Sequence, residues 1–201
     1  RMKYNGFADI NKDRVAVKGD LITGIGQAQV NNFVLRNYSS KMPEYSGNLV
    51  VKDLNTTILT KNKQVGLISG NFNVQGKGFD INTLSLNTKS QISKIELMGK
   101  TLNNISLDGE LAQKQFKGII SIDYTQARGV VNGKIDFSKP RLSADVDAKI
   151  DHLNLAYFGA SGSGTNTFRG DVKGKVSMTN INDLDLDATI NNVVLGGNKS
   201  I

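Results

Sequence analysis

Apolar and polar residues alternate along much of this chain. Between residues 168 and 178, every second position is Phe, Val, Met or Gly, and the positions between them are Arg, Asp, Lys or Ser. The same alternation recurs over 70–74, 116–124, 131–137 and 142–150. Because successive side chains of a β-strand point to opposite faces, this period of two predicts strands that bury one face. No segment has a convincing helical period, so we expect an all-β chain.

The expected strands are long and are separated by turns. Several runs cover about 10 to 12 residues, roughly twice the usual strand length of about 5 to 6. Turn-forming residues lie at 42–44, 75–78 and 138–140, and the Gly- and Ser-rich segment 159–164 predicts a mobile loop. We therefore expect one module, residues 1–201, built on a wide sheet.

A short motif repeats along the chain, in which an aromatic residue is followed two positions later by glycine. It occurs at Tyr4-Asn-Gly6, Tyr45-Ser-Gly47, Phe116-Lys-Gly118 and Phe168-Arg-Gly170. Residues 30–35 closely match residues 190–195, and residues 151–155 resemble both. This repetition predicts a repeat-like sheet in which each unit contacts mainly its neighbours.

Glycine is frequent on the apolar face of the expected strands, although it is disfavoured inside strands. Gly118, Gly133, Gly170 and Gly174 all occupy such positions. One explanation is that these glycines let a long sheet bend strongly around a ligand. The other is that each glycine makes room for a large side chain from across a closed core. The pattern is compatible with both.

Composition narrows the possible functions. The 201 residues include no cysteine and no tryptophan. There are 25 Lys and Arg residues and 18 Asp and Glu residues, which gives a formal net charge of +7. The basic residues are dispersed among acidic ones, which indicates a solvated outer face rather than a nucleic-acid site. The chain starts at Arg1 without a signal segment and has no long apolar stretch. We expect a fragment of a larger protein, so that any signal or membrane anchor lies outside it.

Residues that could carry chemistry are few. His152 is the only histidine, and we interpret it as a polar turn residue. Asp183, Asp185 and Asp187 fall on one face of an expected strand and could hold Ca²⁺, but no calcium-loop sequence follows them, which favours a solvated face. The Gly-Ile-Gly sequence at 24–26 lacks the third glycine of a dinucleotide site. We expect no enzyme activity, no metal and no cofactor.

What remains is an apolar stripe on one face of the expected sheet, which we take as the candidate lipid-contacting groove. It comprises Phe72, Val74, Phe116, Ile120, Ile122, Val131, Ile135, Phe137, Leu142, Val146, Ile150, Phe168, Val172, Val176, Met178, Leu184, Leu186 and Ile190. A second sheet could cover this stripe and make a sealed core, or the stripe could be open to acyl chains or apolar peptide segments. Periodicity does not distinguish the two.

Several segments resemble a known family. Residues 116–123, 131–137 and 151–155, together with 75–79, are similar to the periplasmic repeats of TamB and its AsmA-like relatives, above all the Bacteroidetes type. The resemblance covers most of the chain and rests on degenerate, compositional motifs. It implies an elongated, strongly curved sheet of long strands folded into a U-shaped trough, a β-taco, with an apolar inner surface.

The same resemblance implies a function. Members of this family are lipid-conducting bridge proteins, anchored in the inner membrane, that cross the periplasm and carry phospholipid to the outer membrane or support outer-membrane protein assembly. The implied partners are phospholipid acyl chains and an outer-membrane barrel of the TamA type. Two alternatives stay open: a structural β-solenoid or adhesin-like stalk with a closed core, and a chaperone-like surface that binds outer-membrane protein strands through sheet edges.

Overall fold

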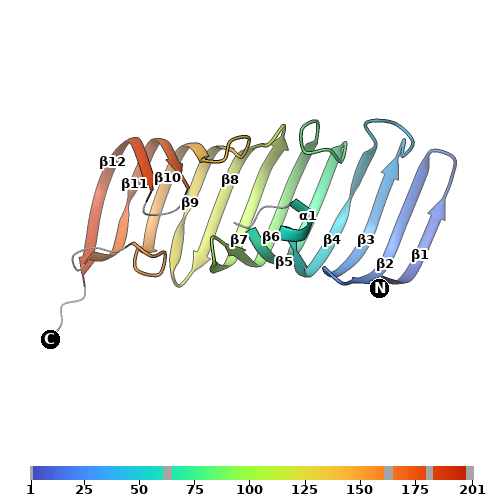
Figure 1. The fold of residues 1–201 in the computed structure, drawn as a ribbon, viewed down its shortest axis with the longest axis horizontal. Coiled ribbons are helices and arrows are strands. Elements are labelled where there is room, and N and C mark those ends of the chain that lie inside the picture. Colours follow the sequence, from blue (N-terminus) through green and yellow to red (C-terminus); the bar gives the residue numbers. More distant parts are fainter. Residues whose placement is uncertain (1, 61–64, 161–164, 180–182, 198–201) are drawn as a thin grey trace. The chain divides into compact units, whose positions relative to one another are not determined.

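The computed structural model describes residues 2–60, 65–160, 165–179 and 183–197. The alternating segments form antiparallel strands, which belong to two compact units (Figure 1). The first unit, Arg1–Lys114, contains β1 (Lys3–Ile10), β2 (Arg14–Thr23), β3 (Gly26–Arg36), β4 (Glu44–Asn55), the short helix α1 (Thr56–Thr60), β5 (Val65–Lys77), β6 (Ser85–Leu97) and β7 (Lys100–Ala112).

The second unit, Gln115–Ile201, contains only strands among its described residues. These are β8 (Gln115–Tyr124), β9 (Ala127–Asp136), β10 (Leu142–Asn154), β11 (Thr165–Met178) and β12 (Leu184–Gly197). Strands of 10 to 14 residues make up this unit. The expectation of an all-β chain with long strands is therefore confirmed.

Each unit is an open antiparallel meander. The strands lie in the order in which they follow one another along the chain, and each strand pairs with the next. Among the described residues, extensive contacts join only consecutive strands within a unit, apart from those of α1 with β5. The expected neighbour-only organisation is confirmed. Neither sheet is closed or strongly curled, so the strong curvature that we expected is not found.

Bends in the strands are local and occur at β-bulges. The register between β3 and β4 shifts between Asn31 and Val34, and Asn32 has a left-handed φ of 51°. The matching segment of β12 behaves in the same way, because Asn192 has a φ of 52° where the register with β11 shifts. Asparagine tolerates this conformation better than most residues, which explains why the Asn-Asn pair occurs in both segments.

The glycines on the apolar face serve a purpose that neither explanation from the sequence covered. A Cβ on Gly174 would approach the Asp187 carbonyl and lie 2.6 Å from the Ala188 Cα, both in the backbone of β12. A Cβ on Gly133 would meet the Asp145 carbonyl of β10 in the same way. These glycines therefore permit close approach of the next strand in the same sheet, rather than accommodating a side chain from an opposite layer.

Two local predictions were wrong. The helix α1 was not expected, because its five residues, Thr56–Thr60, are too few to show a helical period. The Thr56 hydroxyl donates to the carbonyl of Gly66 at 2.7 Å and ties the helix to β5. The turn expected at 75–78 lies later, since β5 continues to Lys77. Of the expected loop at 159–164, residues 161–164 lie outside the described part of the chain.

Candidate functional site

The second unit brings most of the predicted stripe together through strand register. Two rows of apolar side chains cross its five strands. One row contains Phe116, Ile135, Ala144, Val176 and Leu186, and the other contains Ile120, Val131, Ala148, Val172 and Ile190. The remaining stripe residues of this unit are Ile122, Phe137, Leu142, Val146, Ile150, Phe168, Met178 and Leu184. The stripe is thus a continuous surface, as the alternation predicted.

Between these two rows runs a line whose residue is glycine or alanine on four of the five strands. It contains Gly118, Gly133, Val146, Gly174 and Ala188, one from each successive strand. Residues two apart on a strand are about 6.6 Å apart, so the flanking rows lie about 13 Å from each other. The line therefore forms the floor of a shallow channel on β8, β9, β11 and β12, and the channel is interrupted at β10, where Val146 is larger than the flanking Ala144 and Ala148. The sequence alone does not reveal this alignment, because only the register brings the glycines together.

The first unit carries a comparable apolar face that the sequence analysis largely missed. It had assigned only Phe72 and Val74, both in β5, to the stripe. Phe72 lies opposite Leu49 of β4 and Ser90 of β6, and Val74 lies opposite Gly47 and Thr88. One complete row of mainly apolar residues, beside them on the same face, crosses all seven strands. This row contains Tyr4, Leu21, Ala28, Val51, Gly70, Ile92 and Ile105. Alternation in β2, β3 and β7 was the available signal, and bulges obscure it in β3.

Exposure divides the stripe into two classes. Phe116 is 7% exposed and Val172 is 9% exposed, whereas Phe137 is 50% exposed and Ile190 is 38% exposed. Most other members of the stripe are half-buried. No large side chain among the described residues is fully buried. A face covered by a second layer would bury such side chains completely, so the apolar face of each unit is open to solvent within the described part of the chain.

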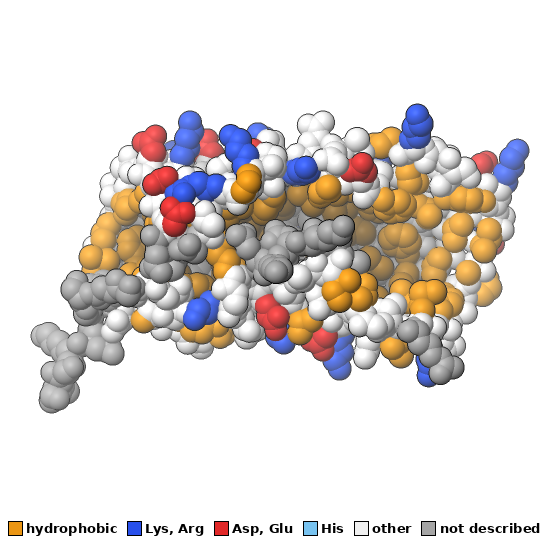
Figure 2. Space-filling model, in the orientation of Figure 1, with side chains coloured by type: hydrophobic (Ala, Val, Ile, Leu, Met, Phe, Trp, Pro, Cys, Tyr) orange, Lys and Arg blue, Asp and Glu red, His pale blue; other side chains and the backbone are white. Residues whose placement is uncertain are grey.

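Figure 2 shows the apolar face from the side seen in Figure 1. Over β1 to β4, hydrophobic side chains form a recessed band with charged side chains at its edges. Over β11 and β12, hydrophobic side chains also reach the surface. A recessed apolar band between polar edges is the arrangement expected of a surface that contacts an apolar ligand while its charged edges stay hydrated.

The opposite face of the second unit carries charges of alternating sign. One row, from β9 to β12, contains Lys134, Asp145, Lys175 and Asp187. In the next row, the Lys173 Nζ lies 3.0 Å from an Asp147 carboxylate oxygen. Lys117 of β8 lies opposite Lys134, but the other neighbouring charges in these rows compensate one another, so the described residues of this face form no cationic band that follows a nucleic-acid backbone. The arrangement agrees with the solvated outer face expected from the sequence.

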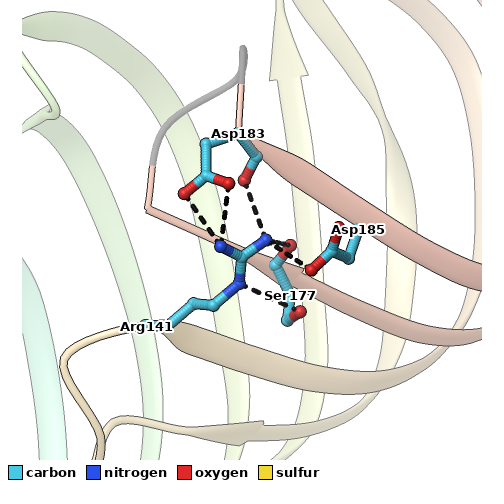
Figure 3. A network of polar contacts seen from close by, with 4 residues as sticks. All are labelled: Arg141, Ser177, Asp183 and Asp185. Carbon is cyan, nitrogen blue, oxygen red and sulfur yellow. Dashed lines mark hydrogen bonds and ion pairs between the residues drawn. The ribbon is translucent and has the colours of Figure 1, made fainter.

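Arg141 connects three chain segments at one end of this unit (Figure 3). Its Nη1 donates to both carboxylate oxygens of Asp183 at 2.8 Å, and its Nη2 donates to Asp185 at 2.8 Å. Its Nε also donates to the Ser177 hydroxyl at 3.2 Å. The hydrogen bonds from Arg141 lower the pKa of Asp183. Two carboxylates of the acidic row considered for Ca²⁺ thus pair with Arg141. The network links the start of β12 to β11 and to the segment before β10.

The other candidate residues show no site for chemistry. His152 lies inside β10 at a bulge, half-buried, so its interpretation as a turn residue was wrong. Within the described ranges, no cluster of three or more His, Cys, Asp or Glu could hold a metal. Three surface hollows, of about 240, 450 and 570 Å³, are lined mainly by polar and charged side chains. The 450 Å³ hollow includes Ala144 and Val176 of one apolar row, but charged residues such as Lys134 and Asp145 dominate its lining, so the two apolar rows remain the best candidate.

Comparisons with family models, curated proteins and solved structures found no match to this chain. The resemblance to TamB and AsmA-like proteins therefore rests on the residues given above. Among the helices that the structure describes, none has the length and apolar character needed to cross a membrane.

Proposed function

We propose that this chain is a lipid-conducting segment of a TamB-like bridge protein and that its apolar face is the trough that holds phospholipid acyl chains. The observation that carries the proposal is the open apolar face, on which long rows of aliphatic side chains stay half-exposed. Soluble monomeric proteins rarely leave so continuous an apolar surface uncovered unless it binds something.

The energetics suit a ligand that is long, apolar and flexible. Each buried methylene contributes roughly 0.8 kcal/mol, and an open face covers about half of an acyl chain's surface. A chain of about 15 carbons would therefore gain on the order of 6 kcal/mol from the channel. A gain of this size corresponds to a dissociation constant of about 40 μM, and the cost of ordering the chain moves it toward the millimolar range, which is weak, reversible binding.

The channel also supports movement along the sheet. Its walls are Val, Ile, Leu and Phe on four strands and alanine on β10, and its floor is Gly or Ala except at Val146, so every strand offers apolar contacts. An acyl chain that shifts by one strand loses and gains comparable surface, which keeps the barrier low. The headgroup would stay in water at the polar edge of the face. This is the behaviour required of a conduit rather than of a tight carrier.

The cellular setting follows from the resemblance. TamB-like proteins cross the periplasm from an inner-membrane anchor toward an outer-membrane barrel of the TamA type, and we propose the same location and partner class for the protein that contains this chain. The proposed role requires no catalytic group and no cofactor. A structural stalk, the main alternative, needs a second layer over the apolar face.

The test is lipid retention measured by native mass spectrometry and lipid extraction. The protein is purified from a cell envelope with minimal detergent and compared with Ile190→Arg, which places a cation on the open apolar face of β12. The matched control is Thr189→Arg, at the adjacent position on the polar face of the same strand. Val172 is a poor choice, because at 9% exposure an arginine there perturbs folding as well as binding.

The proposal expects phospholipid on the wild-type protein and on Thr189→Arg, and a loss of at least about fivefold for Ile190→Arg, with unchanged circular dichroism. A cost of about 1 kcal/mol for placing a charge beside the acyl chain gives that ratio. Bare wild-type protein, or equal retention by the two arginine variants, contradicts the proposal. Bare protein together with unfolding of Ile190→Arg supports the structural alternative.

A further inference from the structure

The last strand of the second unit, β12, has a free edge within the described part of the chain. Its pairing partner on the other side is β11. Val193, Val194 and Leu195, directly after the Asn191-Asn192 pair, are 47%, 58% and 60% exposed. The corresponding side chains of the interior strand β3, at positions 33–35, are half-buried. The unpaired N–H and C=O groups of such an edge can accept a further strand.

The first unit shows what pairs with a strand of this sequence. Residues 30–35 of β3 match residues 190–195 of β12, and their bulges have the same left-handed asparagine. The strand that pairs with this segment of β3 is β4, which begins with the Tyr45-Ser-Gly47 motif. Tyr45 lies opposite Leu35, and the ring of Tyr45 stacks on Phe33 with 6.2 Å between the ring centroids.

The glycine of the motif is needed at the bulge. A Cβ on Gly47 would lie 2.6 Å from the Cα of Phe33, so a residue with a side chain cannot occupy this position while the bulge keeps its shape. The aromatic residue has a separate role, because it supplies the second neighbour of the leucine that follows the bulge. Leu35 lies between Val15 of β2 and Tyr45 of β4 and is half-buried, whereas the equivalent Leu195 has a neighbour on one side only, Phe168 of β11, and is exposed.

A second pair of strands repeats the arrangement within the second unit. The strand β10 has a bulge between Ile150 and Leu153, and its partner β11 carries the Phe168-Arg-Gly170 motif. Phe168 lies opposite Leu153, as Tyr45 lies opposite Leu35. In both pairs a bulged strand is followed by an aromatic-x-glycine strand, and in both the aromatic residue faces the leucine after the bulge.

We infer that the free edge of β12 docks an extended polypeptide strand carrying an aromatic-x-glycine motif. The register follows from β3 and β4. The aromatic residue of the incoming strand lies opposite Leu195, and its glycine lies at the bulge beside Val193. The residue directly after that glycine, equivalent to Asn48 in β4, lies opposite Asn191. The docked strand runs antiparallel to β12 and extends the apolar face by one strand.

The chain offers a direct way to test this register, because it contains no cysteine. The probe is a synthetic peptide with the sequence of residues 43–55, in which Asn48 or Val50 is replaced by cysteine. The protein carries a single cysteine in β12, either Asn191→Cys or Thr189→Cys. In β3 and β4, Asn31 lies opposite Asn48 and Gln29 lies opposite Val50. Opposed positions on antiparallel strands are about 4.5 to 5.5 Å apart, within the range of a disulfide.

The inference expects disulfide trapping between Asn191→Cys and the peptide with cysteine at 48, and between Thr189→Cys and the peptide with cysteine at 50. The two mismatched combinations should react at least about fivefold more slowly, since their Cα atoms are separated by more than about 7 Å. A peptide in which Gly47 is also replaced by valine should lose at least about tenfold in trapping rate, as expected for a clash at the bulge.

Equal trapping in all four combinations, or trapping that is insensitive to the Gly47→Val replacement, overturns the inference. So does equal trapping by a cysteine at Asn5 in β1, because that edge has no bulged Asn-Asn segment. The readout does not depend on lipid. A failure of this experiment therefore leaves the proposed lipid-binding role of the apolar face intact, and a failure to retain lipid leaves the docking edge intact.

Discussion

Two phenylalanines of the stripe provide a quantitative test of which stripe residues hold the sheet together and which are available to a ligand. Phe116 is 7% exposed and Phe137 is 50% exposed, although both belong to the second unit. Replacing a buried phenylalanine by alanine costs about 3 to 5 kcal/mol in a closed core. Because the face is open, we expect the lower end, about 3 kcal/mol, for Phe116→Ala. Phe137 buries a little over half as much of its surface, so Phe137→Ala should cost about 1.5 kcal/mol.

The assay is urea unfolding followed by far-UV circular dichroism, with hydrogen exchange of β8 and β9 as a local readout. With a slope of about 1.5 kcal/mol per molar urea for a unit of this size, the midpoint should fall by about 2 M for Phe116→Ala and by about 1 M for Phe137→Ala. The slope itself should not change, since neither replacement alters the fold. Measuring both variants in the same unit avoids comparison between transitions that need not coincide.

Equal midpoints for the two variants would refute the division of the stripe by exposure. A larger effect of Phe137→Ala would show that this side chain is covered and that the face is closed there. In either case, the proposal of an open trough would lose its main support.

Three other changes test separate features. Gly174→Val should destabilise the pairing of β11 with β12 by about 3 kcal/mol or more, because the new side chain meets the backbone of β12. The control Gly24→Ala, whose Cβ would have no atom within 4 Å, should leave the thermal unfolding temperature unchanged. Arg141→Gln should flatten the acid dependence of the melting temperature. Because the pKa of Asp183 is lowered in the folded protein, the stability that its carboxylate contributes is present above the usual carboxyl pKa and is lost as pH falls below it. An unchanged acid profile in the variant contradicts the network. Burial raises the pKa of Tyr45, so the stability that this tyrosine contributes is full below the usual tyrosine pKa and is lost as pH rises above it. Tyr45→Phe should therefore reduce the loss of stability at alkaline pH. An absorbance titration of the variant should show one fewer tyrosine with a raised pKa.

The sequence was most informative where strands alternate without interruption. In β10 and β11, apolar or small residues such as Val146 and Val176 alternate with charged or polar residues. The structure places these apolar residues on one face, as predicted. In β3 the Asn31-Asn32 bulge shifts the alternation by one residue and hides its apolar face, whereas the alternation in β2 and β7 was visible in the sequence. The repeat of that asparagine pair was visible in the sequence, but its meaning as a bulge was not.

By itself, the sequence determined which face of each strand is apolar, because strand geometry turns a period of two directly into two faces. It also showed the absence of cysteine chemistry and of any motif for catalysis. Only the tertiary structure decided how strands are aligned, which brings Gly118, Gly133 and Gly174 into one channel floor and leaves Ile190 open to solvent. Register, closure and curvature depend on contacts between residues far apart in the chain, and local patterns carry little information about them. The same dependence explains why the glycines suggested a strong curl, whereas their actual neighbours are the backbones of adjacent strands.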